Sequence, residues 1–233
     1  ASWDNPKHQQ QWITTLRTYA FPVLGEMRVD QIQTPDVLRV LSPIWLSKAE
    51  TARRVRQRIG TVLDWAGSAG YRHGENPTSG VTKGLPKQQK NNGHHAARPY
   101  AEVPAFVSRL RSSTNDGQAA RLAFEFLILT ASRTSEVLNA RWTEINLDAA
   151  VWTVPAERMK AKRIHRVPLS TRCIEILKEA RKLDAASPYL FSGTASDRPF
   201  SNAVFLAMLK RMEVTCTAHG FRSSFRDWAA GWR

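Results

Sequence analysis

The sequence is poor in the features that mark secreted and membrane proteins. It has only two cysteines, Cys173 and Cys216, which indicates reduced thiols and not a disulfide framework. It has no apolar run of about 18 residues, the length that a membrane-spanning helix needs, and the segment ASWDNPKHQQQW shows no apolar signal region. We therefore expect a cytoplasmic protein that does not enter a membrane.

Several catalytic and binding motifs are also missing. The sequence contains no Gly-rich phosphate loop, no zinc-type spacing of Cys and His, and no Gly-x-Ser-x-Gly nucleophile elbow. It shows no carboxylate cluster of the kind that holds two catalytic metal ions. These absences give no support to nucleotide hydrolysis, serine esterase chemistry or metal-dependent nuclease chemistry, and no metal site is expected.

Acidic residues are few compared with basic ones. Lys and Arg number 34 against 20 Asp and Glu, so the net charge is +14 and the pI about 10.5. A polyanion that binds such a surface releases its condensed counterions, so a polyanionic partner such as a nucleic acid is expected. The alternative is a basic protein with no nucleic-acid role, because charge alone is a weak signal.

A polar segment divides the chain. Residues 83–99, KGLPKQQKNNGHHAARP, are basic, interrupted by Gly and Pro, and without an apolar period. We place a helical domain at 1–84, a linker at 85–96, and a larger domain of mixed helix and strand at 97–233. The expected fold is mainly α with a small antiparallel β-sheet.

The N-terminal domain shows helical patterns. Apolar residues recur at helical spacing at Trp12, Leu16 and Tyr19. Pro22 is expected to end that helix, and Thr34, followed by Pro35, is expected to cap the next one. The strongest amphipathic pattern runs over 49–66.

Four arginines surround the apolar stripe of the helix expected at 49–66. The stripe consists of Ala52, Val55, Ile59, Val62, Leu63 and Ala66. Arg53 and Arg54 project away from the stripe, whereas Arg56 and Arg58 flank it. Such a helix suits contact with a duplex backbone, and the alternative is a solvated charged face.

The larger domain combines helices with a small sheet. Strands are expected at 144–147, 151–154 and 164–169. Helices are expected at 119–130, from 136, after Ser170, after Ser201 and from about 219.

Three polar sites can carry chemistry. Arg133, in LTASRTSEV, stands at a break between helical segments with Glu136 one turn later, which suits presentation of a guanidinium to a phosphate. His219 and Arg222, in AHGFRSSFRDWA, share one helix face. A basic turn, ERMKAKRIHRVPL, contains Arg158, Lys160, Lys162, Arg163 and Arg166. Taken singly, each site is also compatible with a structural role as a surface ion pair, a solvated turn or a packed histidine.

Together and in this order, the three sites resemble the tyrosine recombinase family, also called the phage integrase family, in its prophage and genomic-island branch. The resemblance implies a helical core-type DNA-binding domain and an integrase-type catalytic domain. It implies that the catalytic residues are Arg133, Lys160, His219 and Arg222, with Glu136 in support and Lys162 as the alternative to Lys160. The expected DNA-contacting residues are Arg53, Arg54, Arg56, Arg58, Arg158, Lys162, Arg163 and Arg166.

The resemblance also implies a reaction. A site-specific recombinase of this family cuts and rejoins the core DNA of attachment sites through a 3′-phosphotyrosyl bond, in assemblies of several copies on DNA, without a metal or nucleotide cofactor. The tyrosines are Tyr19, Tyr71, Tyr100 and Tyr189, and none follows Arg222, where the family places its nucleophile. The sequence is therefore expected to bind DNA without cleaving it. The alternatives are a non-catalytic DNA-binding protein derived from a truncated integrase and a relative of type IB topoisomerases.

Overall fold

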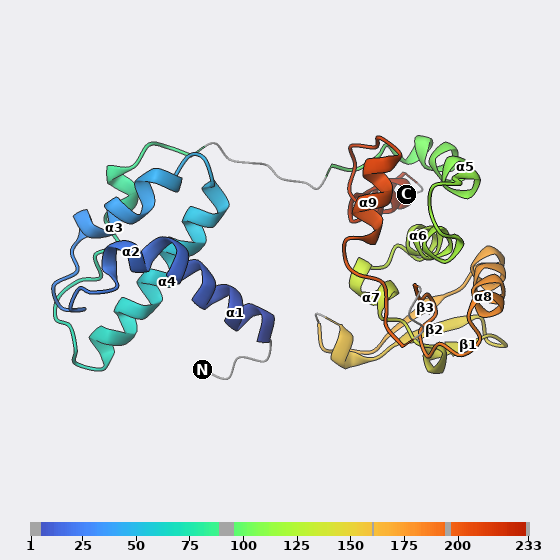
Figure 1. The fold of residues 1–233 in the computed structure, drawn as a ribbon, viewed down its shortest axis with the longest axis horizontal. Helices are drawn as coiled ribbons and strands as arrows, with labels where there is room; N and C mark the ends of the chain where they lie inside the picture. Colours follow the sequence, from blue (N-terminus) through green and yellow to red (C-terminus); the bar gives the residue numbers. More distant parts are fainter. Residues whose placement is uncertain (1–5, 89–95, 160, 194–196, 232–233) are drawn as a thin grey trace. The chain divides into compact units, whose positions relative to one another are not determined.

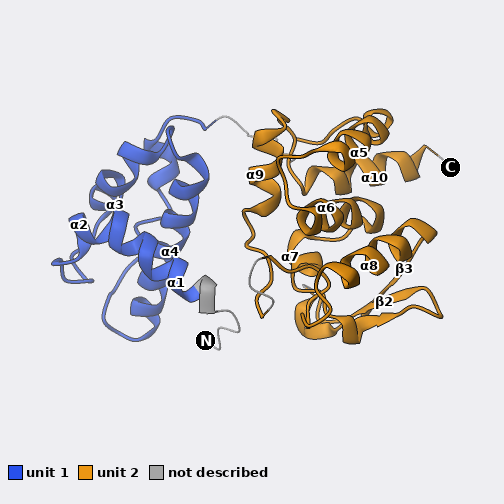
Figure 2. Ribbon diagram, turned by 45° about the vertical axis from the view of Figure 1, so that its right-hand side comes forward, with its two compact units in different colours: residues 1–91 blue, residues 92–233 orange. Residues whose placement is uncertain are grey.

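The structure is a computed structural model that describes residues 6–88, 96–159, 161–193 and 197–231. Residues 89–95, in the middle of the expected linker, and Lys160 lie outside the described residues. The chain forms two compact units, residues 1–91 and 92–233 (Figures 1 and 2). No helix among the described residues combines the length and apolar character needed to cross a membrane.

Unit 1 is a group of helices around one apolar core (Figure 1). Its helices are α1 (Pro6–Thr15), the π-helical turn Leu16–Ala20, α2 (Phe21–Leu24), α3 (Thr34–Leu41) and α4 (Ala49–Ser68), with 3-10 turns at Ser42–Ile44 and Val81–Gly84. The helix expected at 49–66 is therefore confirmed as α4. Five of its six stripe residues are buried, and Val62 is the exception, at 43% exposed.

Two expected helix ends in unit 1 are wrong. Pro22 does not end the first helix, because the chain stays helical from Pro6 to Leu24. The π-helical turn before it widens the backbone where the proline ring would otherwise press on the preceding turn. Gln33, and not Thr34, caps α3: the Asp36 carboxylate accepts a hydrogen bond from the Gln33 N–H at 2.9 Å. The Thr34 hydroxyl instead donates to the Pro77 carbonyl at 3.0 Å.

Arg58 does not belong to the exposed basic face that the sequence predicted. Its side chain is buried, with 4% of the residue exposed. Its Nη1 donates to the Gln11 carbonyl at 2.8 Å and to the Thr15 hydroxyl, and its guanidinium lies 5.5 Å from the centre of the Trp12 ring. Arg58 thus holds α1 against α4, because its buried guanidinium needs the hydrogen-bond acceptors that α1 supplies.

Unit 2 is built around α6 (Gln118–Thr130), in which residues 122–128 are all buried. The helices α5 (Val103–Ser112), α9 (Val204–Arg211) and α10 (Gly220–Ala230) lie on one side of α6. The helices α7 (Thr134–Leu138) and α8 (Thr171–Leu183) lie on its other side, together with the sheet (Figures 1 and 2). Short 3-10 turns occupy Tyr100–Glu102, Trp142–Glu144 and Ala156–Arg158.

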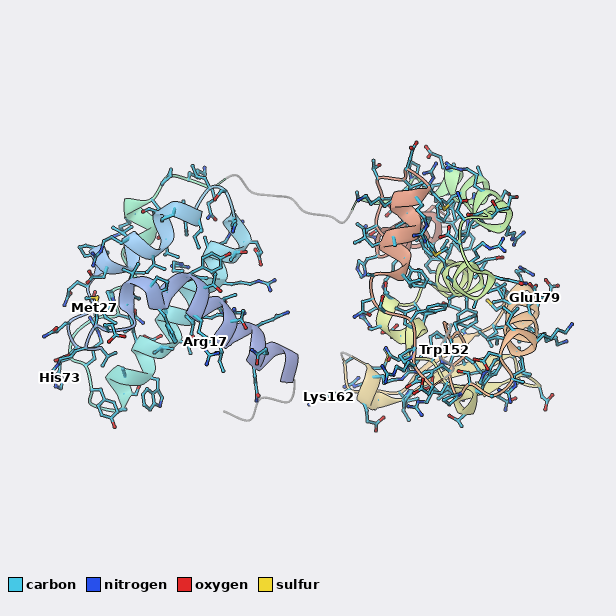
Figure 3. All side chains as sticks on the ribbon, in the orientation of Figure 1. Arg17, Met27, His73, Trp152, Lys162 and Glu179 are labelled. Carbon is cyan, nitrogen blue, oxygen red and sulfur yellow. The ribbon has the colours of Figure 1, made fainter. Side chains whose placement is uncertain are left out.

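The sheet has three antiparallel strands in the order β1-β2-β3. They are β1 (Ile145–Asn146), β2 (Val151–Val154) and β3 (His165–Pro168), which confirms the expected hairpin, the third strand and the fold class. Trp152, labelled in Figure 3, points into the core and is fully buried beside Phe126.

One of the two expected serine caps in unit 2 is confirmed. Ser170 caps α8 and accepts a hydrogen bond from the Cys173 N–H at 3.3 Å. Ser201 caps nothing, because α9 begins only at Val204. The Ser201 carbonyl instead closes a turn by accepting the Val204 N–H at 3.1 Å.

Replacing Arg58 with Ala should destabilise unit 1, because the hydrogen bonds and the ring contact that join α4 to α1 through Arg58 are lost. We expect a loss of about 1–3 kcal/mol. Hydrogen–deuterium exchange on α1 and α4 measures it, and Arg54→Ala, which removes only an exposed pair with Glu50, is the matched control. Equal protection of α1 in both variants would show that Arg58 has no structural role.

Candidate phosphate-binding site

The joint between α6 and α7 fixes the position of Arg133. Ala131 ends α6 with a φ of 47°, a left-handed conformation that few residues other than glycine adopt. Arg133 then caps α7, where its N–H donates to Glu136 Oε2 at 2.9 Å and its Nη1 pairs with Oε1 at 2.5 Å. Glu136 is buried and orients the Arg133 guanidinium. Because 36% of the Arg133 side chain is exposed, the guanidinium also remains accessible to solvent.

The last helix reaches back to this joint. His219 caps α10, and Arg222 lies in its first turn. Arg222 Nη1 donates to the Ala131 carbonyl at 2.8 Å, across 91 positions of sequence. This hydrogen bond joins the helix that carries His219 and Arg222 to Ala131, which lies two positions before Arg133 in the sequence.

A cleft of about 500 Å³ opens where α10, the end of α6 and the start of β3 meet. The residues that line it are Thr130, Ala131, His165, His219, Arg222, Ser223, Phe225, Arg226 and Ala229. Two guanidinium groups and two imidazoles line it, and none of the described lining residues carries a carboxylate, although Arg226 pairs with the neighbouring Asp227 at 3.3 Å. The cleft therefore favours an anion.

Of the four residues predicted to be catalytic, His219 and Arg222 line this cleft. Arg133 is not among the lining residues, but it comes two positions after Ala131, which lines the cleft. Lys160 is not described. His165 and Arg226 line the cleft without having been predicted, although the alternation of side chains along a strand gives a signal for His165.

The base of the β2–β3 hairpin is tied to α7 by Arg158. Its Nη1 donates to the Glu136 carbonyl at 3.1 Å, and its Nη2 pairs with Glu144 Oε2, which also accepts the Trp152 Nε1–H at 2.9 Å. The side chains of Arg158 and Glu144 are 22% and 10% exposed. The structure thus gives Arg158 a role within unit 2, because it neutralises a carboxylate that is largely buried.

The chain enters unit 2 along α10. The Ala96 carbonyl accepts the Thr217 N–H at 3.0 Å, and the Arg98 carbonyl accepts the Ser224 hydroxyl. A Cβ on Gly220 would lie 2.3 Å from the Ala96 oxygen, so only glycine fits directly after His219. The start of unit 2 thus packs against the helix that carries His219 and Arg222.

The outer basic residues differ in their surroundings. Arg53 and Arg54 on α4 are 45% and 58% exposed and pair with Glu50 at 3.6 and 2.9 Å, and Arg56 is half-buried. In unit 2, Lys162, Arg163 and Arg166 are exposed on the hairpin. Figure 3 shows Lys162 in the turn at its far end.

Two sequence families cover most of the chain. Residues 1–81 match the phage integrase central domain, and residues 100–229 match the phage integrase family. The prophage integrase IntZ of Escherichia coli (strain K12) is 34% identical over 220 residues, which are 94% of this chain and 54% of IntZ. The integrase of Enterobacteria phage P4 is 27% identical over 237 residues, which are 94% of this chain and 53% of that protein. The chain thus spans about half the length of these relatives.

Solved structures share the fold. A lambda integrase fragment, in a dimer bound to a COC′ core site, superimposes with a TM-score of 0.77 at 15% identity over 95% of this chain and 82% of that one. The Tn1549 transposon integrase, in complex with circular intermediate DNA, gives 0.77 at 14% identity over 98% and 83%. The chain belongs to the phage integrase family of tyrosine recombinases, as the three sequence sites predicted.

Replacing Arg158 with Ala should destabilise unit 2, because the largely buried Glu144 carboxylate loses its ion-pair partner. We expect a loss of about 3 kcal/mol, the lower end for a buried pair, since part of Arg158 is exposed. Urea unfolding measures it. Adding Glu144→Gln should recover part of the loss, and Arg163→Ala, on the exposed side of the hairpin, should change little. A full loss in the double variant would contradict the ion-pair explanation.

Proposed function

We propose that this chain supplies the DNA-binding and phosphate-holding parts of a site-specific DNA recombinase. The hydrogen bond from Arg222 to the Ala131 carbonyl carries the proposal, because it joins the His219-x-x-Arg222 pair to the turn that leads into Arg133. The DNA complexes of lambda and Tn1549 integrases support duplex DNA as the substrate. A lambda integrase tetramer on a Holliday junction supports assembly of several copies on DNA.

In the proposed reaction, Arg133 and Arg222 bind the non-bridging oxygens of the scissile phosphate and stabilise its charge in the transition state. A tyrosine hydroxyl attacks phosphorus, a 3′-phosphotyrosyl bond forms, and the bond to the 5′ oxygen breaks. Lys160 gives a proton to the leaving 5′ oxygen, and His219 assists proton transfer. The 5′-hydroxyl of another strand then attacks the same phosphorus and releases the tyrosine.

The attacking tyrosine is proposed to lie outside residues 1–233. None of the four tyrosines in the described residues lines the cationic cleft. Tyr189 lies beneath Arg141, with the guanidinium 5.0 Å from the ring centre, and Tyr100 lines a separate apolar pocket. Tyr19 and Tyr71 belong to unit 1. The same observation supports the second candidate, a protein that occupies DNA sites without cutting.

DNA contact is proposed for one basic set in each unit. The set in unit 1 is Arg53, Arg54 and Arg56, and the set in unit 2 is Lys162, Arg163 and Arg166. Arg58 and Arg158 are left out because both make buried hydrogen bonds within the protein. Two sets on two units give each copy of the chain two separate places to neutralise phosphates.

Duplex binding should weaken steeply with salt, because each neutralised phosphate releases counterions. Fluorescence anisotropy across a salt series gives the slope of log affinity against log salt, expected at about −0.9 per phosphate contacted. The triple change of Arg53, Arg54 and Arg56 to Gln should make this slope shallower, by up to about 3 phosphate contacts.

The control for this experiment is Lys178→Gln with Lys182→Gln, two exposed lysines on α8. These changes remove similar charge from a helix that is not proposed to contact DNA. If the control flattens the slope as much per charge as the arginine variant, then overall charge explains binding and α4 does not contact DNA.

The chain of residues 1–233 should bind attachment-site DNA without a covalent bond. A nicked duplex with the attachment junctions of the encoding element, resolved on a denaturing gel, should show no protein–DNA band. A chimera that carries the IntZ segment following the matching arginine should form the band, and Arg133→Ala in that chimera should abolish it. A band from residues 1–233 alone would place the nucleophile among the tyrosines present.

A further inference from the structure

His165 lies on the core side of the sheet, at the end of β3. It is the register partner of Val154, and directly opposed residues of antiparallel strands project to the same face. Val154 is fully buried, and Val167, which lies two positions from His165 on the same face of β3, is also buried. The side chain of Arg166 projects to the opposite face. The strand geometry therefore directs His165 toward the helices and not toward the outer surface of the hairpin.

His165 is nevertheless exposed, because the apolar core ends where the cleft begins. The core-facing positions of β2 and β3 cover the side of α6, and His165 lies beyond them, at the level where α6 ends in Thr130 and Ala131. It lines the cleft with His219 and Arg222, which come from α10. Two elements that are distant in sequence, β3 and α10, thus place two imidazoles and a guanidinium around one space.

The lining of the cleft suits a phosphate. Arg222 and Arg226 supply positive charge, and each imidazole supplies an N–H donor. Among the described residues no carboxylate lines the cleft, although Arg226 also pairs with Asp227 at 3.3 Å just outside it. A cleft of about 500 Å³ has room for a phosphate group together with the sugar atoms attached to it.

We infer that His165 is a phosphate-contacting residue, whose imidazole donates a hydrogen bond to an oxygen of the DNA phosphate that Arg222 binds. The inference rests on the proposed function and adds a residue, from the strand after the basic turn, to the set on α10 and the α6–α7 joint. Binding of a phosphate would then connect β3 to α10 through the ligand, in addition to the contacts that α6 already makes.

Imidazole signals in NMR spectra test the inference directly. The chain, uniformly labelled with ¹⁵N, is titrated with inorganic phosphate and separately with a short duplex, at constant ionic strength set with chloride. The six histidines are assigned by single His→Gln variants. The ring signals of His165 and His219 should shift together and saturate at one ligand concentration, whereas the signal of His73, exposed in unit 1, should not shift.

Variants measure the contribution of the imidazole to phosphate affinity. His165→Phe keeps a ring but removes the donor, and should weaken phosphate binding about tenfold, the effect of one hydrogen bond to a charged group. His165→Gln keeps an N–H donor and should recover part of that loss. His73→Phe is the matched control and should bind phosphate like the unmodified chain. Equal affinity of His165→Phe and the unmodified chain would overturn the inference.

The failure of the inference and that of the proposed function give different results. If duplex DNA shifts the His219 signal but not the His165 signal, the recombinase pocket stands and His165 does not contact the phosphate. If inorganic phosphate shifts both signals but bound duplex shifts neither, the cleft binds anions without receiving DNA, and both proposals are wrong.

Discussion

The hydrogen bond between Arg222 and the Ala131 carbonyl is the contact on which the candidate site depends. Ala131 adopts a left-handed conformation at the end of α6, which sets the direction in which the chain leaves that helix and so the position of Arg133. Arg222 fastens α10 to the same turn at 2.8 Å. The turn at the end of α6 therefore positions two arginines that lie far apart in the sequence. The central residues of α6 are buried, so this turn follows a helix that is packed on all sides.

A second constraint is that this basic chain buries several carboxylates, each against arginine. The pairs are Glu136 with Arg133, Glu144 with Arg158, Asp116 with Arg211, and Glu125 with Arg111 and Arg172. Burial raises the pKa of Glu125, but the hydrogen bonds from Arg172 and Arg111 outweigh it and hold that pKa below its usual value. Several arginines of unit 2 thus neutralise carboxylates inside the protein. The net charge of the chain therefore overstates the basic surface that is available to a partner.

The sequence predicted the fold class, the helix α4 and the three strands, because each has a strong apolar period of its own. It could not separate Arg58 from Arg56, since both flank the same stripe and only the position of α1 decides which one is buried. The role of Arg158 was hidden for the same reason: its partners, Glu136 and Glu144, come from other elements. The spacing of His219 and Arg222 predicted that they share one helix face. The cleft that they line is formed by α10 together with the end of α6 and the start of β3, so it follows from tertiary packing.

The close packing of the Ala96 carbonyl on Gly220 has a consequence for how this protein tolerates change in length. The first described residues of unit 2 are part of the wall behind His219, since Thr217 and Ser224 both bond to their carbonyls. Insertion or deletion of a residue within 96–98 would shift those carbonyls along α10 and displace the helix. The segment that connects the units is thus constrained at its C-terminal end by the geometry of the site.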